Sequence, residues 1–125
     1  MSPTTIADVR TIGINVADQD AAIDFYVNRL GFEKRLDAPI SDTMRWIEVA
    51  PPAATTSIAL NSTDDAARVG VDTGIRFTVP DAESEHAALT KGGVTVGELL
   101  RWEGVPPMFS FDDPDGNRFY IVEAS

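Results

Sequence analysis

The chain has 125 residues, of which 43% are hydrophobic, and this length fits a single domain with one principal core. Ten basic and twenty acidic residues give a formal net charge of −10, and the arginines are scattered, which argues against nucleic-acid binding. The absence of cysteine excludes disulfides, thiolate metal sites and a cysteine nucleophile. No apolar run is long enough to cross a bilayer, and no secretory signal is recognisable, so we expect a cytoplasmic protein.

A strand and a helix are the first elements that the sequence predicts. Apolar and polar residues alternate in Thr11–Val16, which is typical of a half-buried strand. Asp18 then caps a helix predicted from about Gln19 to Leu30, and Gly31 ends it in the left-handed conformation. The residues expected on the buried face of this helix are Ala22, Phe25, Tyr26 and Leu30.

Three further strand-like segments complete the first half of the chain. They are Glu33–Asp37, Arg45–Ala50 and Thr56–Asn61, with a loop over Ala38–Thr43. The segment Ser62–Asp72 is polar and rich in small residues, so it is interpreted as a linker.

The second half repeats this order of elements. Gly74–Val79 alternates like the first strand, Asp81 takes the place of Asp18, and a helix follows over Ala82–Lys91 with Ala88 and Leu89 facing inward. This helix is expected to stop at Gly92 and Gly93. Three strands are then predicted over Val94–Leu99, Met108–Asp112 and Arg118–Glu123, with a loop over Arg101–Pro107 and a hairpin turn over Asp113–Asn117.

The repeat predicts an α+β domain of two β-α-β-β-β modules. Module one covers about 9–61, a linker about 62–72, and module two about 73–123. In each module the first strand turns its apolar face to its own helix, so a polar face of small residues is left on the other side. That face carries Thr11, Gly13 and Asn15 in module one, and Gly74, Arg76 and Thr78 in module two. Periodicity alone is compatible with a cavity wall and with a solvated sheet face.

Four motifs in this order carry a resemblance to a known family. They are Val16–Tyr26, Leu30–Phe32, Arg45–Pro52 and the hairpin Asp113–Asn117. Together they resemble the vicinal oxygen chelate (VOC) superfamily of glyoxalases, bleomycin resistance proteins and extradiol dioxygenases, over about Val9 to Glu123. The resemblance implies that the two modules form a cupped mixed sheet around a central pocket.

The resemblance also implies a divalent metal in the cup, held by His, Gln or Glu. The family's ligand positions fall on Thr11, Ala59, Gly74 and Tyr120, and none of these is a normal metal ligand. A register error of one residue would change the assignment for a single strand only. The single histidine, His86, lies in the second helix and is expected at the surface. We therefore predict no cofactor, with a divalent metal as the alternative.

Without a metal, the inward-facing groups define a ligand site. The predicted ligand-binding residues are Thr11, Asn15, Trp46, Glu48, Ser57, Arg76, Trp102, Met108 and Tyr120. Aromatic rings, one guanidinium and several hydroxyls suit a planar or mildly anionic organic ligand. Alternatives stay open: Arg76 forms an internal ion pair with Glu48, Trp46 belongs to the core, and Trp102 and Met108 form a lid or a dimer contact.

Three hypotheses for the function follow. The first is a small-molecule binding protein without a metal, similar to the antibiotic-sequestering bleomycin resistance proteins. The second is an enzyme, a glyoxalase-like lyase, an isomerase or a dioxygenase, with unusual metal ligands or with acid–base catalysis by Glu48 or Tyr120. The third is an interaction domain whose inner face is filled by its own side chains. We expect a homodimer joined through the module edges and the segment Met1–Ala7, with no nucleic-acid or membrane partner.

Overall fold

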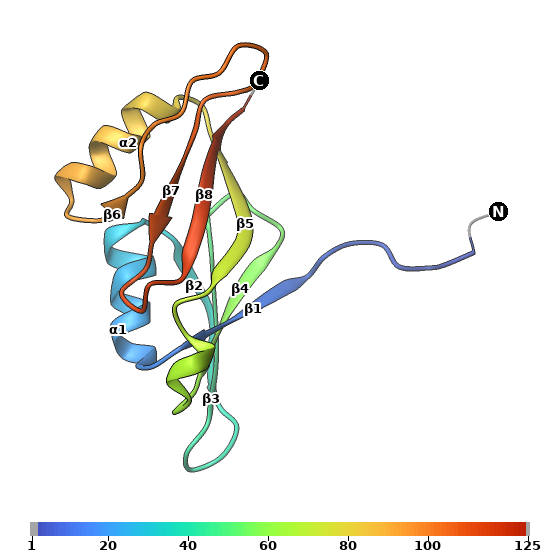
Figure 1. The fold of residues 1–125 in the computed structure, drawn as a ribbon. Helices are drawn as coiled ribbons and strands as arrows, with labels where there is room; N and C mark the ends of the chain where they lie inside the picture. Colours follow the sequence, from blue (N-terminus) through green and yellow to red (C-terminus); the bar gives the residue numbers. More distant parts are fainter. Residues whose placement is uncertain (1–2, 125) are drawn as a thin grey trace.

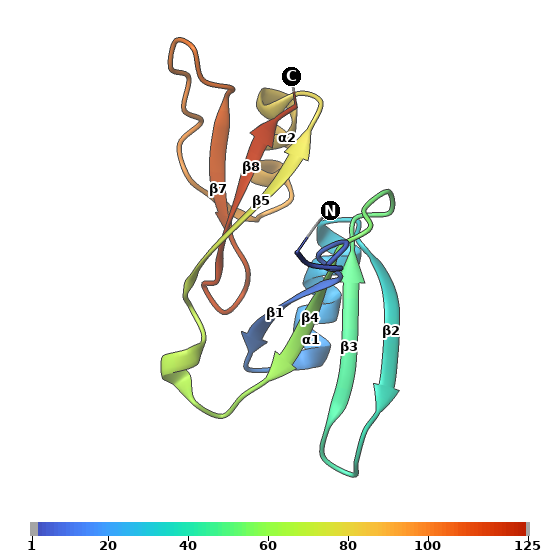
Figure 2. The same ribbon diagram turned by 90° about the vertical axis from the view of Figure 1, so that its right-hand side faces the viewer.

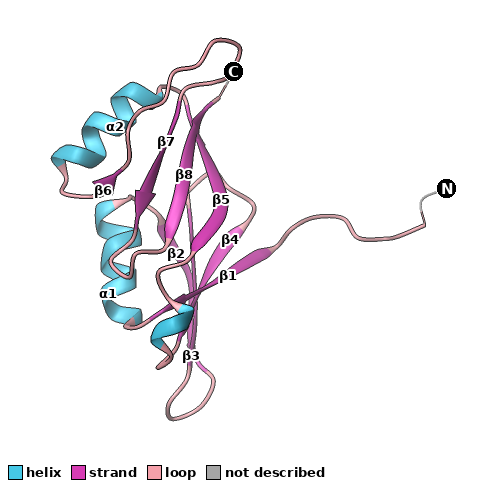
Figure 3. Ribbon diagram, viewed as in Figure 1, coloured by secondary structure: helices cyan, strands magenta, loops and turns pink. Residues whose placement is uncertain are grey.

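The two copies of the repeat fold into two four-stranded sheets, each covered by helix on one side (Figures 1 and 3). The computed structural model describes residues 3–124, so Met1 and Ser2 of the segment expected to join a dimer lie outside the described residues. The strand orders are β1-β4-β3-β2 and β5-β8-β7-β6. The pairs β1–β4 and β5–β8 are parallel and the remaining pairs are antiparallel. The predicted α+β architecture is thereby confirmed.

Module one follows the predicted order of elements. Its elements are β1 (Thr11–Val16), α1 (Gln19–Ile23), η1 (Asp24–Arg29), β2 (Glu33–Pro39), β3 (Arg45–Ala50) and β4 (Ser57–Ser62). The Asp18 carboxylate caps α1 by accepting the N–H groups of Asp20 and Ala21. The predicted single helix changes at Asp24 into the π-helical turn η1, where the Leu30 N–H donates to the Phe25 carbonyl. Gly31 then has a φ of 81°, as the end of the helix requires.

Module two departs from the prediction in two places. Its elements are the 3₁₀ turn η2 (Ala66–Arg68), β5 (Asp72–Val79), α2 (Ala82–Lys91), β6 (Thr95–Val96), β7 (Met108–Asp112) and β8 (Arg118–Glu123). The strand predicted over Val94–Leu99 is wrong in length, because only β6 pairs regularly with β7. The prediction that Ala88 faces inward is also wrong, because Ala88 is exposed. The buried residues of α2 are Ala82 and Leu89, which lie on the same face of the helix because they are seven residues apart.

Aromatic rings from both modules share one core. Phe119 on β8 is fully buried, and its ring centroid lies 6.0 Å from that of Tyr26 in module one and 5.7 Å from that of Phe77 on β5. Phe77 in turn packs against Phe32 of module one at 5.4 Å. The two modules are therefore held together by an aromatic cluster as well as by the chain.

A hydrogen-bond network at the turn before β8 adds a second link between the modules. The Tyr26 hydroxyl donates to the Asp113 carboxylate across 2.7 Å, and both residues are buried. The Asn117 side-chain amide donates to the Asn15 carbonyl of β1 at 2.9 Å, and its oxygen accepts the Gly70 N–H at 2.9 Å. We call these contacts the Asp113 network. The predicted hairpin turn thus also fixes module two against module one.

Both sheets leave one face uncovered. Figure 1 shows the helices on one side of the sheets, and Figure 2 views the other side, which we call the open face. As the alternation predicted, this face carries Thr11, Gly13 and Asn15 on β1, and Gly74, Arg76 and Thr78 on β5. Residues 3–10 form an extended arm that projects on the same side (Figure 1). Among residues 3–124, no helix is long and apolar enough to span a membrane.

Candidate functional site

A buried carboxylate organises the open face of module one. Glu48 on β3 is only 4% exposed, and its Oε1 accepts a hydrogen bond from Ser57 Oγ at 2.6 Å. Its Oε2 accepts bonds from Trp46 Nε1 at 2.7 Å and from Arg10 Nη1 at 3.1 Å. Thr11 Oγ1 lies 3.1 Å from Ser57 Oγ and joins the same group. We call these five residues the Glu48 cluster.

The Glu48 cluster keeps its carboxylate ionised. Burial alone favours the neutral acid, but the hydrogen bonds from Ser57, Trp46 and Arg10 outweigh it and hold the pKa of Glu48 below its ordinary value. Both carboxylate oxygens are occupied by donors from this chain. Glu48 is therefore poorly suited to accept a proton from a substrate near neutral pH, and it serves instead to fix Trp46 and Ser57 in place.

We expect Glu48→Gln to reduce the free energy of unfolding by about 2 kcal/mol at neutral pH, because an amide nitrogen then faces donors. Since the pKa of Glu48 is lowered by folding, its contribution is present above its ordinary pKa and is lost as the pH falls. The difference between the two proteins should therefore shrink between about pH 5 and pH 3 in urea unfolding. Glu98→Gln, at an exposed position, is the control. A difference that does not change with pH would contradict this role.

The open face of module two has its own polar group. The Arg76 guanidinium lies over the Tyr120 ring, 5.1 Å from its centroid, and Arg76 Nη1 donates to the Gly74 carbonyl at 2.8 Å. The Tyr120 hydroxyl donates to Asp72 Oδ2 at 2.6 Å. This hydrogen bond, followed by burial, raises the pKa of Tyr120, so the phenol is a poor acid or base near neutrality. Neither residue proposed for acid–base catalysis is thus tuned toward proton transfer.

The structure brings the predicted site residues together as two groups. Thr11, Trp46, Glu48 and Ser57 meet in the Glu48 cluster, and Arg76 meets Tyr120 on module two. The remaining predicted residues join neither group: Asn15 lies opposite Asn61, Met108 lies opposite Val122, and Trp102 is 59% exposed on the loop before β7.

Arg10 is the residue of this site that the sequence did not predict. The alternative that Arg76 pairs with Glu48 is wrong, because Arg10 holds that carboxylate. Strand alternation places Arg10 on the face opposite to its neighbour Thr11. It reaches Glu48 because it stands just before β1, where the regular strand has not begun.

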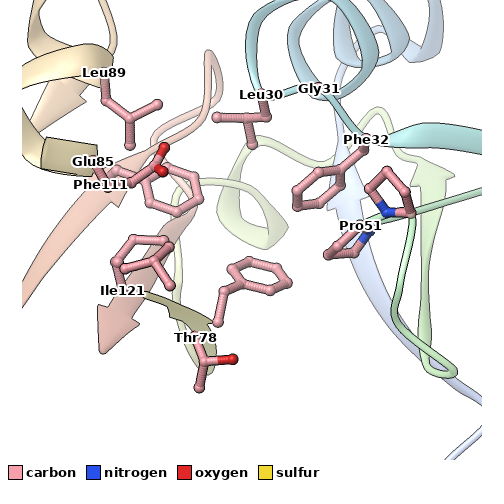
Figure 4. Close-up of a pocket in the computed structure, with 12 residues that line it drawn as sticks. Leu30, Gly31, Phe32, Pro51, Thr78, Glu85, Leu89, Phe111 and Ile121 are labelled. Carbon is pink, nitrogen blue, oxygen red and sulfur yellow. The ribbon is translucent and has the colours of Figure 1, made fainter. Parts of the chain in front are cut away.

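Cavities lie beside the Glu48 cluster and between the modules. A cavity of about 280 Å³ is lined by Arg10, Arg35, Leu36, Glu48, Thr55 and Ser57. A larger one, of about 530 Å³, separates β1 and the loop before β4 from β5. It adjoins a cavity of about 160 Å³, with which it shares Pro51, Phe77 and Thr78. Figure 4 shows this smaller cavity, with Phe32 and Pro51 of module one facing Leu89 and Phe111 of module two. We call the two adjoining cavities the crevice.

Comparison with known proteins assigns the chain to a protein family. The sequence model of the glyoxalase/bleomycin resistance protein/dioxygenase superfamily matches residues 8–121. The chain belongs to this superfamily. The protein YurT of Bacillus subtilis (strain 168) is 32% identical over 120 residues, which cover 88% of this chain and 94% of YurT.

Two solved structures show the same fold over almost the whole chain. A member of the superfamily from Sphaerobacter thermophilus DSM 20745 is 39% identical, with a TM-score of 0.88 and coverage of 97% of this chain and 100% of that one. TnmS3, an antibiotic binding protein from Streptomyces sp. CB03234, is 31% identical, with a TM-score of 0.86 and coverage of 98% and 99%.

The metal chemistry of the superfamily does not fit the residues of this chain. Of the four ligand positions, Ala59 and Gly74 carry no side-chain donor atom, the Thr11 hydroxyl bonds to Ser57 and Arg10, and the Tyr120 hydroxyl is bonded to Asp72. Within the described residues, no three His, Asp or Glu side chains are grouped so as to hold a metal. His86 is half-buried, with Nε2 2.9 Å from the Gly97 carbonyl and its ring against Phe109. This donor set matches no divalent-metal site.

Proposed function

We propose that this member of the superfamily binds a small organic molecule on its open face without a resident metal. The observation that carries the proposal is the Glu48 cluster, of which Arg10, Glu48 and Ser57 line a cavity of about 280 Å³. Both carboxylate oxygens of Glu48 accept hydrogen bonds, which hold Ser57 and Trp46 in place. A hollow lined by a few oriented polar groups is typical of a recognition site. Catalysis has less support, because the pKa shifts of Glu48 and Tyr120 both point away from neutrality.

The similarity to TnmS3 supports this proposal. That protein binds an antibiotic, and it shares 31% of its residues and the fold with this chain. Binding of a drug-like organic molecule is therefore a function that the fold supports at this level of similarity. An antibiotic-resistance role by sequestration is the form of the proposal that this neighbour favours.

We further propose that the protein works as a homodimer in which a second copy covers the open face. Leu36 and Trp46 are large apolar side chains exposed on this face, and Ile6 and Val9 are exposed on the arm that projects on the same side. Further exposed large apolar side chains lie outside the strands: Ile40, Met44, Val71, Trp102 and Val105. Leu36 lies opposite Glu48 in the sheet register, so it shares the face of the Glu48 cluster. If the open faces of two copies meet around a two-fold axis, the Glu48 clusters of both copies are enclosed between them.

A fluorescence titration tests the binding proposal, because Trp46 and Trp102 are the two tryptophans of the chain. We expect a panel of neutral, cationic and anionic aromatic compounds to contain ligands that change the emission. Trp46→Ala should weaken the best of them by about tenfold, through loss of one aromatic contact. Trp102→Ala, on the loop before β7, is the matched control. Binding should survive dialysis against a chelator. A panel without ligands, or one tightly bound metal ion per chain, would contradict the proposal.

A further inference from the structure

The crevice between the modules has a single cation at its mouth. Among the described residues, Arg76 is the only charged one that lines the cavity of about 530 Å³, and Glu85 lines the adjoining smaller cavity. The other walls are mostly apolar: Val9, Ile12 and Ile58 come from module one, and Ile75 and Phe77 come from β5. A cavity with apolar walls and one charged group at its edge suits an amphipathic ligand, because the ligand's polar end is then fixed by a single contact.

Arg76 is held in place and keeps donors free. Its guanidinium stacks on the Tyr120 ring and donates one hydrogen bond, from Nη1 to the Gly74 carbonyl. A guanidinium has five N–H donors, and within the described residues Nε and Nη2 of Arg76 have no acceptor. These donors form the fork that binds a carboxylate with two parallel bonds, so little side-chain freedom is lost when a ligand arrives.

Arg76 also has no carboxylate in direct contact within the described chain. The pKa of Asp72 is lowered mainly by its hydrogen bond from Tyr120, and the charge of Arg76 contributes less. Several arginines have carboxylate partners, such as Arg10 with Glu48 and Arg118 with Asp112, whereas Arg76 forms no ion pair with any residue from 3 to 124. The neighbouring Asp72 is bonded to the Tyr120 hydroxyl and to the Gly74 N–H instead. In a chain with a net charge of −10, an unpaired cation at a cavity mouth is a selective contact for an anion.

We propose that the crevice binds an amphipathic monocarboxylate, with its apolar body between the modules and its carboxylate on Arg76. The volume lies within the range of small-molecule sites. Multiply charged ligands are repelled by the acidic chain, so a single negative charge on an apolar body fits best. This inference rests on the proposed small-molecule function, names the ligand class, and assigns the ligand to the crevice, which shares no lining residue with the cavity beside the Glu48 cluster.

Calorimetry with a matched pair of probes tests the proposal on the full chain. 2-Naphthylacetate and its neutral amide, 2-naphthylacetamide, share the apolar body and differ in the charge that Arg76 would contact. We expect the carboxylate to bind about tenfold more tightly than the amide. Arg76→Gln should remove this preference and leave the affinity for the amide unchanged. Arg118→Gln, an exposed arginine on β8 paired with Asp112, is the control that keeps the preference.

A second variant tests the apolar body independently of charge. Ala54 lines the crevice, and Ala54→Phe should fill part of it and weaken both probes by about fivefold or more. The inference is overturned if Arg76→Gln keeps the preference for the carboxylate, or if Ala54→Phe leaves both affinities unchanged. If other aromatic compounds bind the wild type while 2-naphthylacetate does not, this inference fails and the proposed function stands. If no compound binds, both fail.

Discussion

Asp113→Asn is expected to lower the free energy of unfolding by about 3 kcal/mol, a large part of the stability of a domain of this size. Every contact of the Asp113 carboxylate is a donor: the Tyr26 hydroxyl at 2.7 Å, the Asn117 side-chain amide at 3.0 Å, and the N–H groups of Asp115 and Asn117 at 2.9 Å. An asparagine places its own NH₂ group against two of these donors. Because Asp113 is buried, water cannot replace the lost bonds.

Urea unfolding at neutral pH measures this effect, with Asp42→Asn at an exposed hairpin position as the control. Tyr26→Phe tests the same network from its other end. Burial, followed by the charge of Asp113, raises the pKa of Tyr26 far above its ordinary value. The unfolded chain therefore loses the phenolic proton first, and wild-type stability should fall above about pH 10. Tyr26→Phe should reduce this fall. A variant of Asp113 as stable as the Asp42 control would show that the network contributes nothing.

Local patterns were sufficient to predict most elements of the fold. Asp18 and Asp81 accept hydrogen bonds from backbone N–H groups at the starts of α1 and α2. They were predictable because an aspartate side chain just before a helical segment is short enough to cap its free N–H groups. The same reasoning failed where packing decides. The π-helical turn over Asp24–Arg29 fixes how Phe25 and Tyr26 enter the core, and β6 is shortened to two residues beside β7. Neither outcome follows from periodicity.

The candidate site was predictable only in part, for a related reason. Alternation correctly placed Trp46, Glu48 and Ser57 on one face, since each lies within a regular strand. It could not supply Arg10, which precedes β1, or the crevice, whose walls meet only when the modules are placed against each other. The family's metal-ligand positions predicted a site without a metal, because residues such as Ala59 and Gly74 have no side-chain donor atom. That prediction remains to be tested by metal analysis.

The arm offers the strongest test of the homodimer. Ile6, on this arm, is 84% exposed. Burying one isoleucine gains about 1.5 kcal/mol or more, and a two-fold dimer buries two. Ile6→Asp should therefore raise the dimer dissociation constant by about 100-fold or more, and deletion of residues 1–8 should do the same.

Sedimentation velocity between about 1 and 100 µM protein measures the change. Thr5→Asp adds the same charge at the neighbouring position of the arm, so it separates loss of the apolar contact from repulsion between acidic chains. A wild-type protein that stays monomeric over this range would contradict the dimer, and a dimer insensitive to Ile6→Asp would move the interface away from the arm. In either case no second copy would cover the Glu48 cluster, and a ligand bound there would contact one chain only.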